Sequence, residues 1–194
     1  MTVESGNNKK RKEKEEKKVV LKGILKDKVV LVPSSEDIEG LTSRGYGTPE
    51  NNNLALRHYE ALYLVDKGIM EVIDEETGTQ IGFQQLLTKA RIVDKDAWVR
   101  YLIYHDLRSR GYVVREGFGL GIDFRVYKRG EYSKSTAEYL VLGIKEGQPV
   151  TVMDLAGILS RAQSLKKTLI LSVLNRRGEI VYYSLSQLSF KKEA

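Results

Sequence analysis

Two carboxylates are the first side chains in this sequence that could do chemistry together. Asp123 opens an apolar run typical of a β-strand, and Glu138 opens the next one. A metal-dependent nuclease of the D…E-x-K type would have a lysine two residues after Glu138, but that position is Leu140. The chain has no cysteine and only 2 histidines, so it lacks the ligand cluster that zinc requires. The sequence therefore predicts neither a metal site nor a cofactor.

Three glycines, Gly117, Gly119 and Gly121, alternate just before Asp123. Glycines at such spacing bind phosphate groups when they connect a strand to the start of a helix. Here the run that follows has a strand pattern, so the dinucleotide-binding and P-loop interpretations do not hold. The glycines predict a turn between two strands.

Three neighbouring strings in the second half of the chain carry a resemblance to a known family. Residues 106–114 read DLRSRGYVV, residues 117–127 read GFGLGIDFRVY, and residues 136–141 read TAEYLV. They resemble the C-terminal domain of the tRNA-splicing endonucleases, where D-L-R-x-R-G-Y-x-V, D-F-x-V-Y and H-x-E-Y-L-V follow a helix in this order. The likeness extends over the chain after residue 18 and is specific from about residue 96 to residue 183.

The resemblance implies which side chains would act on RNA. Family members cleave RNA without metal, through a tyrosine, a histidine and a lysine. The resemblance places the tyrosine at Tyr127, the lysine at Lys167 and the histidine at the position of Thr136. In this reaction a 2′-hydroxyl loses a proton and attacks the adjacent phosphate, while the leaving 5′-oxygen gains a proton. A phenol-type base, an imidazolium acid and an ammonium group meet these needs.

Thr136 stands where the proton donor should be. Imidazole suits that role because its pKa lies near neutral pH, whereas a threonine hydroxyl is far too weak an acid. Since general acid–base groups contribute about 10²–10⁴-fold in rate, we expect strongly impaired catalysis. Lys134 is a poor acid near neutrality, and His58 and His105 fall in helices as surface or boundary residues. The tyrosine and the lysine are therefore expected to be vestigial.

The resemblance thus implies a structural, non-catalytic subunit of an archaeal-type tRNA-splicing endonuclease. The implied partners are a catalytic paralogue, in an α2β2 heterotetramer, and precursor tRNA. The complex would cut at a bulge-helix-bulge and leave 2′,3′-cyclic phosphate and 5′-hydroxyl ends. Position and charge predict four RNA-binding residues, Arg125, Lys128, Arg129 and Arg161. Two alternatives stay open: an active endonuclease with an unorthodox general acid, and a free-standing RNA-binding protein.

The end of the chain bears on assembly. In the family, the loop between the last two strands is acidic and inserts into a basic pocket of a neighbouring subunit. Here that loop, residues 175–179, reads NRRGE and is neutral to basic. The following segment is apolar at residues 180–183, Leu185, Leu188 and Phe190. It is predicted to be a pairing edge, because long apolar edges need covering, and the family covers it by antiparallel pairing in a dimer.

Periodicity and turn residues predict a mixed α/β fold in two domains. Residues 18–93 are expected to form a small α/β domain, and residues 94–194 a nuclease-like domain with a mixed sheet flanked by helices. The first domain is predicted to contain strands at 19–25, 29–32 and 70–73, a short helix through Ile38, and helices at 54–68 and 82–90. The second is predicted to contain helices at 96–110 and 151–165 and strands at 112–115, 123–128, 137–144, 168–174 and 179–185.

Charge is concentrated at the start of the chain. The net charge of the 194 residues is +6, and residues 9–18 hold seven basic and three acidic side chains, which supplies +4 of it. Residues 1–17 are therefore predicted to be a disordered charged tail, able to attract phosphate groups. The absence of cysteine and of any apolar run near 20 residues predicts a cytoplasmic protein without membrane contact.

Overall fold

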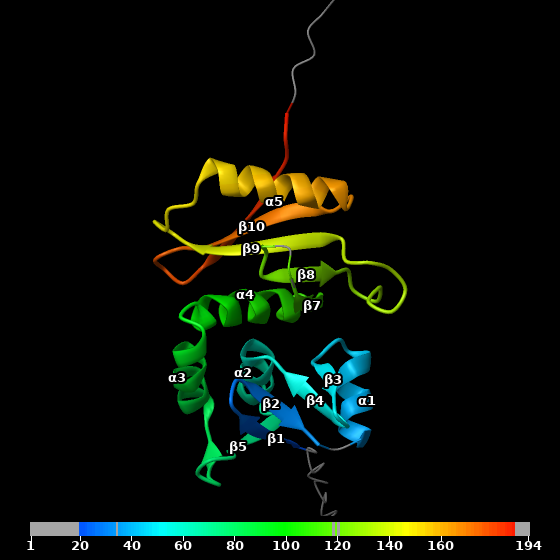
Figure 1. Cartoon of the computed structure of the whole chain (residues 1–194), viewed down its shortest axis with the longest axis vertical. Helices are drawn as coiled ribbons and strands as arrows, with labels where there is room; N and C mark the ends of the chain where they lie inside the picture. Colours follow the sequence, from blue (N-terminus) through cyan, green and yellow to red (C-terminus); the bar gives the residue numbers. More distant parts are fainter. Residues whose placement is uncertain (1–19, 34, 118, 120, 189–194) are drawn as a thin grey trace, which may run out of the picture.

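The computed structural model describes residues 20–33, 35–117, 119 and 121–188. Two mixed β-sheets, one from each half of the chain, lie on either side of helix α4 (Ala97–Ser109), as Figure 1 shows. The mixed α/β fold class predicted from the sequence is therefore confirmed. The predicted charged tail and Phe190 lie outside the described residues.

The first sheet has the strand order β3-β4-β2-β1-β5-β6. Its strands are β1 (Leu21–Lys26), β2 (Val29–Val32), β3 (Thr48–Glu50), β4 (Asn53–Leu56), β5 (Met70–Asp74) and β6 (Gln80–Ile81). Its helices are α1 (Ser35–Ser43), α2 (His58–Asp66) and α3 (Phe83–Val93). The predicted hairpin at the start of the chain is confirmed, because β1 and β2 pair antiparallel around a turn in which Asp27 adopts a φ of 50°.

The helix predicted over residues 54–68 is wrong in its first part. Residues 53–56 form β4, which pairs with β2 and β3, and α2 begins only at His58. Leu54 and Leu56 are both fully buried, and their two-residue spacing fits a strand as well as a helix. The two asparagines before β4 have positive φ values of 44° and 65°, so the chain reverses there and returns as a strand.

Two further differences concern short elements. Helix α1 runs on to Ser43 instead of ending near Ile38, because Leu41 on its next turn is fully buried against the sheet. Strands β3 and β6 were not predicted, and they span three and two residues without an apolar alternation that would mark them.

The second sheet has the order β11-β10-β9-β8-β7. Its strands are β7 (Val113–Glu116), β8 (Phe124–Tyr127), β9 (Tyr139–Lys145), β10 (Thr168–Leu174) and β11 (Ile180–Leu185). Strands β9 and β10 are parallel and the other neighbours are antiparallel. Helix α5 (Val152–Ser164) crosses between the two parallel strands, and Thr151 caps its N-terminus, because the N–H of Asp154 donates to Thr151 Oγ1 at 3.1 Å. Every predicted element of this half is confirmed.

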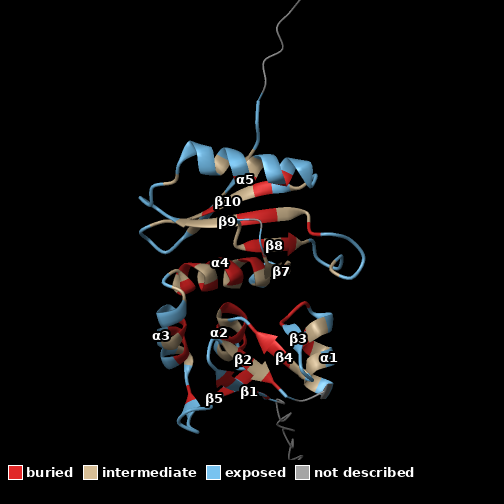
Figure 2. Ribbon diagram, viewed as in Figure 1, coloured by how far each residue is buried: buried red, intermediate tan, exposed pale blue. Residues whose placement is uncertain are grey.

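Helix α4 packs against both halves of the chain and belongs to one continuous core (Figure 2). Toward α2 and β8, the rings of Tyr59, Tyr104 and Phe124 form a buried cluster in which Tyr59 lies 5.0 Å from Tyr104 and 5.1 Å from Phe124. Toward β9, Ile103 lies so close to Gly143 that a Cβ atom there would be 2.5 Å from Ile103 Cδ1. The glycine therefore lets the helix approach the sheet.

The other face of the second sheet is covered less completely. Helix α5 buries only Ile158 and Ala162, and the rest of the helix is exposed or half-buried (Figure 2). Among the described residues, no helix is long and apolar enough to cross a membrane.

We expect the Tyr104→Phe variant to be more stable than the wild-type protein by about 1 kcal/mol. The Tyr104 hydroxyl is buried and has no hydrogen-bond partner among the residues that the structure describes, so its removal relieves a desolvation cost. Tyr182→Phe is the matched control, because the Tyr182 hydroxyl donates to Asp106 Oδ2 at 2.7 Å. That variant should lose about 1 kcal/mol. Urea unfolding of the three proteins measures both changes, and equal losses in the two variants would contradict the assignment.

Candidate functional site

A cleft with a volume of about 580 Å³ opens where strands β8, β9 and β10 meet the loops at their ends. We call it the tyrosine–lysine cleft; it is lined by Arg125, Tyr127, Tyr132, Ser135, Thr136, Ala137, Leu140, Leu165 and Lys167. Strand β8 ends at its tyrosine, β9 begins just after its threonine, and the turn from α5 into β10 supplies its lysine. Because the three strands are neighbours in the sheet, the fold brings the three predicted site residues together.

Lys167 and Thr136 are in direct contact. The Lys167 ammonium donates a hydrogen bond to Thr136 Oγ1 at 2.6 Å. The backbone of the turn fixes this lysine, because its N–H donates to the carbonyl of Ala162 at 2.9 Å and the preceding Lys166 adopts a φ of 55°. The threonine oxygen thus serves as an acceptor for a cation.

Tyr127 lies half-buried in the wall of the cleft, and its ring packs against a second tyrosine. The rings of Tyr127 and Tyr132 meet edge-to-face, with centroids 5.1 Å apart and an interplanar angle of 88°. Tyr132 was not singled out in the sequence. It lies in an irregular loop, where no periodicity or motif marks a residue that packs on the site.

Both histidines of the chain lie outside the tyrosine–lysine cleft. His58 begins α2, and its Nε2 lies 3.4 Å from Asp94 Oδ2. His105 lies on α4 and contacts Asp66 and Lys67, at 3.5 Å and 3.2 Å. Neither histidine lines the cleft, and the prediction that none replaces the family's imidazole stays a prediction. His58 is indeed a boundary residue, since its side chain is 15% exposed between α2 and α4.

Comparison with known proteins gives the family. A model described as "tRNA intron endonuclease, catalytic C-terminal domain" matches residues 97–182, and the corresponding N-terminal domain model matches residues 21–87. The tRNA-splicing endonuclease of Methanococcus vannielii is 34% identical over 164 residues, which cover 84% of this chain and 92% of that protein. The protein of the same name from Pyrococcus furiosus is 34% identical over 149 residues, covering 76% and 84%. The chain belongs to the tRNA intron endonuclease family.

The match to a longer member of the family covers a smaller share of that protein. The tRNA-splicing endonuclease of Methanosarcina mazei is 32% identical over 176 residues, which cover 90% of this chain and 48% of that protein. The resemblance inferred from the sequence strings is confirmed at the level of the family.

The four residues predicted to bind RNA are spread over the second half of this family member. Arg125 lines the tyrosine–lysine cleft, and its Nε donates to the carbonyl of Glu116 at 2.9 Å. Lys128 forms an ion pair with Glu138 at 2.6 Å. Arg129 lies over Gly111, and Arg161 lies beside Gly121 on the exposed side of α5. Only Arg125 therefore lies in the cleft, and RNA binding by the four residues stays a prediction.

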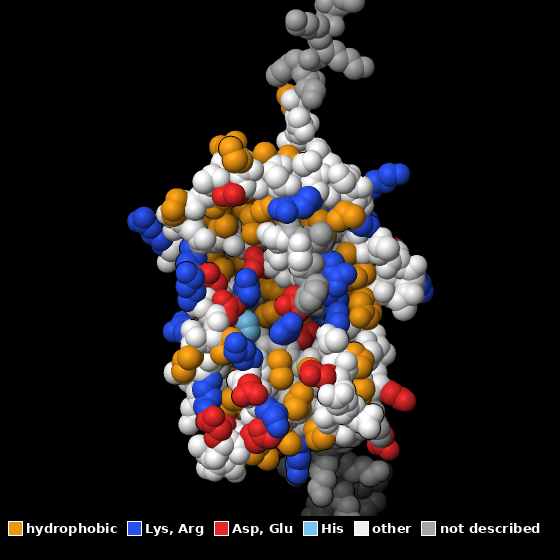
Figure 3. All heavy atoms as spheres, in the orientation of Figure 1, with side chains coloured by type: hydrophobic (Ala, Val, Ile, Leu, Met, Phe, Trp, Pro, Cys, Tyr) orange, Lys and Arg blue, Asp and Glu red, His pale blue; other side chains and the backbone are white. Residues whose placement is uncertain are grey.

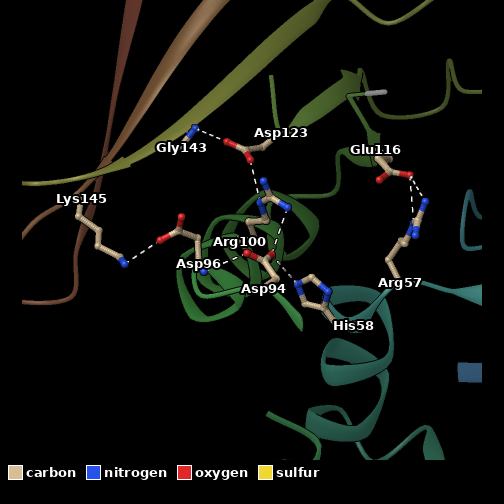
Figure 4. A network of polar contacts seen from close by, with 9 residues as sticks. All are labelled: Arg57, His58, Asp94, Asp96, Arg100, Glu116, Asp123, Gly143 and Lys145. Carbon is tan, nitrogen blue, oxygen red and sulfur yellow. Dashed lines mark hydrogen bonds and ion pairs between the residues drawn. The ribbon is translucent and has the colours of Figure 1, made fainter. Parts of the chain in front are cut away.

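The two carboxylates that open the strands have structural partners. Asp123 accepts hydrogen bonds from the Gly143 N–H at 2.7 Å and from Arg100 Nε at 2.8 Å. Arg100 also reaches Asp94 at 3.1 Å, so one guanidinium joins the turn before α4 to the start of β8 (Figure 4). Glu138 is held by its ion pair with Lys128. The described residues contain no group of three or more potential metal ligands of the His, Cys, Asp or Glu type.

This network crosses the boundary between the two halves of the chain. Figure 4 shows His58 on α2 pointing at Asp94, which in turn contacts Arg100 and through it Asp123. On the face shown in Figure 3, basic and acidic side chains alternate over this region. The face is therefore not a uniformly basic surface.

A second hollow, with a volume of about 380 Å³, lies between the two halves. We call it the arginine hollow; it is lined by Ser43, Arg44, Tyr46, Tyr63, Arg108, Gly111, Tyr112, Val113, Gly130, Tyr132 and Ser133. The guanidinium of Arg108 lies 4.0 Å above the ring of Tyr46 and donates to the carbonyl of Arg44 at 3.1 Å. No acidic side chain is among these lining residues, so the hollow is electropositive.

We expect the stability of the protein to fall as pH is lowered from about 6.5 to 4 because of His58. Burial lowers the pKa of His58 to about 4 although Asp94 opposes the change, while an unfolded histidine titrates near 6.5. Between these values the unfolded state binds more protons, so the His58 contribution is complete above pH 6.5. It is lost toward pH 4, by up to about 3 kcal/mol.

The matched variant is His58→Gln, which has no titrating group at this position. Burial raises the pKa of Glu60 and of Asp123, but these groups titrate in both proteins, so the difference between the two isolates His58. Urea unfolding at pH 7 and at pH 4.5 measures it. Identical pH dependence in the two proteins would refute the role of His58.

Proposed function

We propose that this chain is a structural, non-catalytic subunit of a tRNA-splicing endonuclease. One observation carries the proposal: Thr136 occupies the histidine position of the tyrosine–lysine cleft and accepts a hydrogen bond from Lys167. With both histidines outside the cleft, the cleft lacks a group that protonates a leaving 5′-oxygen near neutral pH. Tyr127 and Lys167 are then remnants of an ancestral nuclease site.

The substrate and the partner follow from the family. Relatives named tRNA-splicing endonuclease support precursor tRNA as the RNA that this chain helps to hold. In our proposal a catalytic paralogue with the complete trio cuts at a bulge-helix-bulge and leaves 2′,3′-cyclic phosphate and 5′-hydroxyl ends. Two copies of each chain form an α2β2 heterotetramer. We also propose that the boundary between the two domains lies near residue 93, between the two family matches.

Charge supports a heteromeric assembly over a homomeric one. The tip of the β10–β11 hairpin is rigid, because Asn175 Oδ1 accepts from the N–H groups of Arg177 and Glu179, each at 2.9 Å. The Arg176 N–H donates to Glu146 Oε2 at 2.9 Å, and both arginine side chains of the tip are exposed. In the family an acidic tip enters a basic pocket of a neighbour. Here the tip and the arginine hollow are both basic, so a second copy of this chain would meet like charge.

In our proposal, the second contact between subunits is made at strand β11, at the edge of the second sheet. Strand β11 is the edge strand, and its Val181 and Tyr183 are 40% and 52% exposed. Leu188, just after the strand, is 77% exposed. An exposed apolar edge of this kind favours pairing with a strand of another subunit.

Mixing this chain with a histidine-bearing paralogue should give cleavage of an intron-bearing precursor tRNA that neither chain gives alone. The expected reason is that the paralogue contributes the proton donor and this chain contributes assembly and RNA positioning. Cleavage is measured by gel analysis of labelled precursor. If the paralogue alone cleaves the precursor as well as the mixture does, the structural-subunit proposal is wrong.

Variants of this chain distinguish the catalytic alternative. If the chain alone cleaves, and Tyr127→Phe and Lys167→Ala abolish the cleavage, it is an endonuclease with an unorthodox acid. In our proposal the chain alone is inactive, and Thr136→His restores at most partial cleavage, because the imidazolium lacks the hydrogen-bond partners that would orient it.

Reversing the charge of the hairpin tip should allow the chain to associate with itself. In the Arg176→Glu/Arg177→Glu variant, an acidic tip faces the arginine hollow of a second copy, and attraction replaces repulsion. Sedimentation at low ionic strength should show a higher average mass than for the wild-type chain. The control Arg176→Gln/Arg177→Gln removes the repulsion without adding attraction. Adding Arg44→Glu to the acidic variant should reverse the gain, and an unchanged mass in the acidic variant would contradict the charge argument.

A further inference from the structure

Tyr132 is a wall residue of both hollows on this protein. Its ring lines the tyrosine–lysine cleft on one side and the arginine hollow on the other. It lies half-buried in the loop between β8 and β9, whose other residues from Glu131 to Thr136 are exposed. A group that enters the arginine hollow therefore meets the same ring that packs against Tyr127.

The contacts of the Tyr132 ring are close on both sides. Toward the cleft it meets Tyr127 edge-to-face at 5.1 Å. Toward the arginine hollow it lies against Gly45, where a Cβ atom would be 3.3 Å from the ring atoms Cε1 and Cζ. Gly45 has a φ of 76°, a conformation that side chains other than glycine rarely adopt. The ring thus fills the space between the first half of the chain and Tyr127.

The two loops that meet at the Tyr132 ring differ in the hydrogen bonds that hold them. The loop with Gly45 is fixed, because its carbonyl accepts from Arg115 at 3.0 Å and the Gly47 N–H donates to the buried Glu60 carboxylate at 2.9 Å. The loop with Tyr132 is held by turn bonds within the loop and by the hydrogen bond from Lys167 to Thr136 Oγ1 at its end. Its Lys134 and Ser135 N–H groups both donate to the Glu131 carbonyl at 2.9 Å.

These turn bonds tie Lys134 and Ser135 to Glu131, so a displacement of the Tyr132 ring would be passed on to Ser135, and Thr136 is the next residue along the chain. Both Ser135 and Thr136 line the tyrosine–lysine cleft.

We propose that Tyr132 is a positioning residue that couples occupancy of the arginine hollow to the placement of Tyr127 and Thr136 in the tyrosine–lysine cleft. The group it senses is a carboxylate-bearing peptide segment, because Arg44 and Arg108 line the hollow and no acidic side chain does. The biological meaning of the coupling rests on the proposed function, in which that segment belongs to the partner subunit. The coupling itself is a property of the isolated chain and is tested there.

The test places a carboxylate in the arginine hollow without relying on the affinity of a peptide. The chain has no cysteine, so Ser43→Cys gives a single thiol on the rim of the hollow. Iodoacetate converts it to a carboxymethyl group. Tyrosines labelled with ¹³C report the environment of Tyr127, whose signal is assigned by its loss in Tyr127→Phe. The control Ser160→Cys carries the same group on the exposed face of α5.

We expect carboxymethylation at position 43 to shift the Tyr127 signal and modification at position 160 to leave it unchanged. In the Tyr132→Ala background the shift at position 43 should fall to the level of the position 160 control. In Tyr132→Phe, which keeps the ring, the shift should remain. Thermal unfolding of each variant verifies that it is folded.

Two results would overturn the proposal. Absence of a shift in the Ser43→Cys protein would show that the two hollows are not coupled. A shift that persists in Tyr132→Ala would show that Tyr132 does not transmit it. Neither result bears on whether the chain activates a catalytic paralogue, so this proposal and the structural-subunit proposal fail independently.

Discussion

The packing of α4 against both halves of the chain is the constraint on which the rest of the structure depends. One side of the helix contributes Tyr104 to the buried aromatic cluster with α2, and the other side places Ile103 against the β9 backbone at Gly143. Arg100 then fixes the helix by joining Asp94 to Asp123. Because Asp123 also accepts from the β9 backbone, the same contacts hold β8 beside β9. The tyrosine–lysine cleft lies at the far ends of these strands, so contacts outside the cleft place the strands that carry its residues.

The threonine at the centre of the cleft also has an electrostatic consequence. An imidazolium at position 136 would stand beside the Lys167 ammonium, and two cations at such a distance repel each other. A threonine hydroxyl instead accepts a hydrogen bond from that ammonium, and hydrogen bonds to charged groups contribute about 1.5–3 kcal/mol. Threonine at position 136 therefore avoids a contact between like charges beside Lys167.

The second half of the fold could be predicted from the sequence, because its strands and helices are long and separated by clear turn residues. The first half was harder to predict, because the apolar residues at 54 and 56 fit the periodicity of a helix as well as that of a strand. Their segment is a strand because β4 pairs with β2 and β3. The resemblance to the family's motifs pointed to Tyr127, Thr136 and Lys167, and the sheet order brings them together. Tyr132 and the arginine hollow could not be found in this way. The hollow is built by side chains from segments far apart in the sequence, such as Arg44 just after α1 and Arg108 in α4, and no local sequence pattern predicts that these side chains lie together.

The tyrosine–lysine cleft and the arginine hollow share one lining residue, Tyr132. A docking site and a reaction site on opposite faces of a protein communicate only through many intermediate contacts, each of which can absorb a displacement. Here the ring of Tyr132 lines both, and it lies between Gly45 on one side and the ring of Tyr127 on the other. In the structural subunit that we propose, such a ring would have no reaction of its own to regulate, and its proposed role is to set the shape of the surface that the cleft offers to RNA. The basic hairpin tip favours, as the source of the group that presses on the ring, a chain other than a second copy of this one.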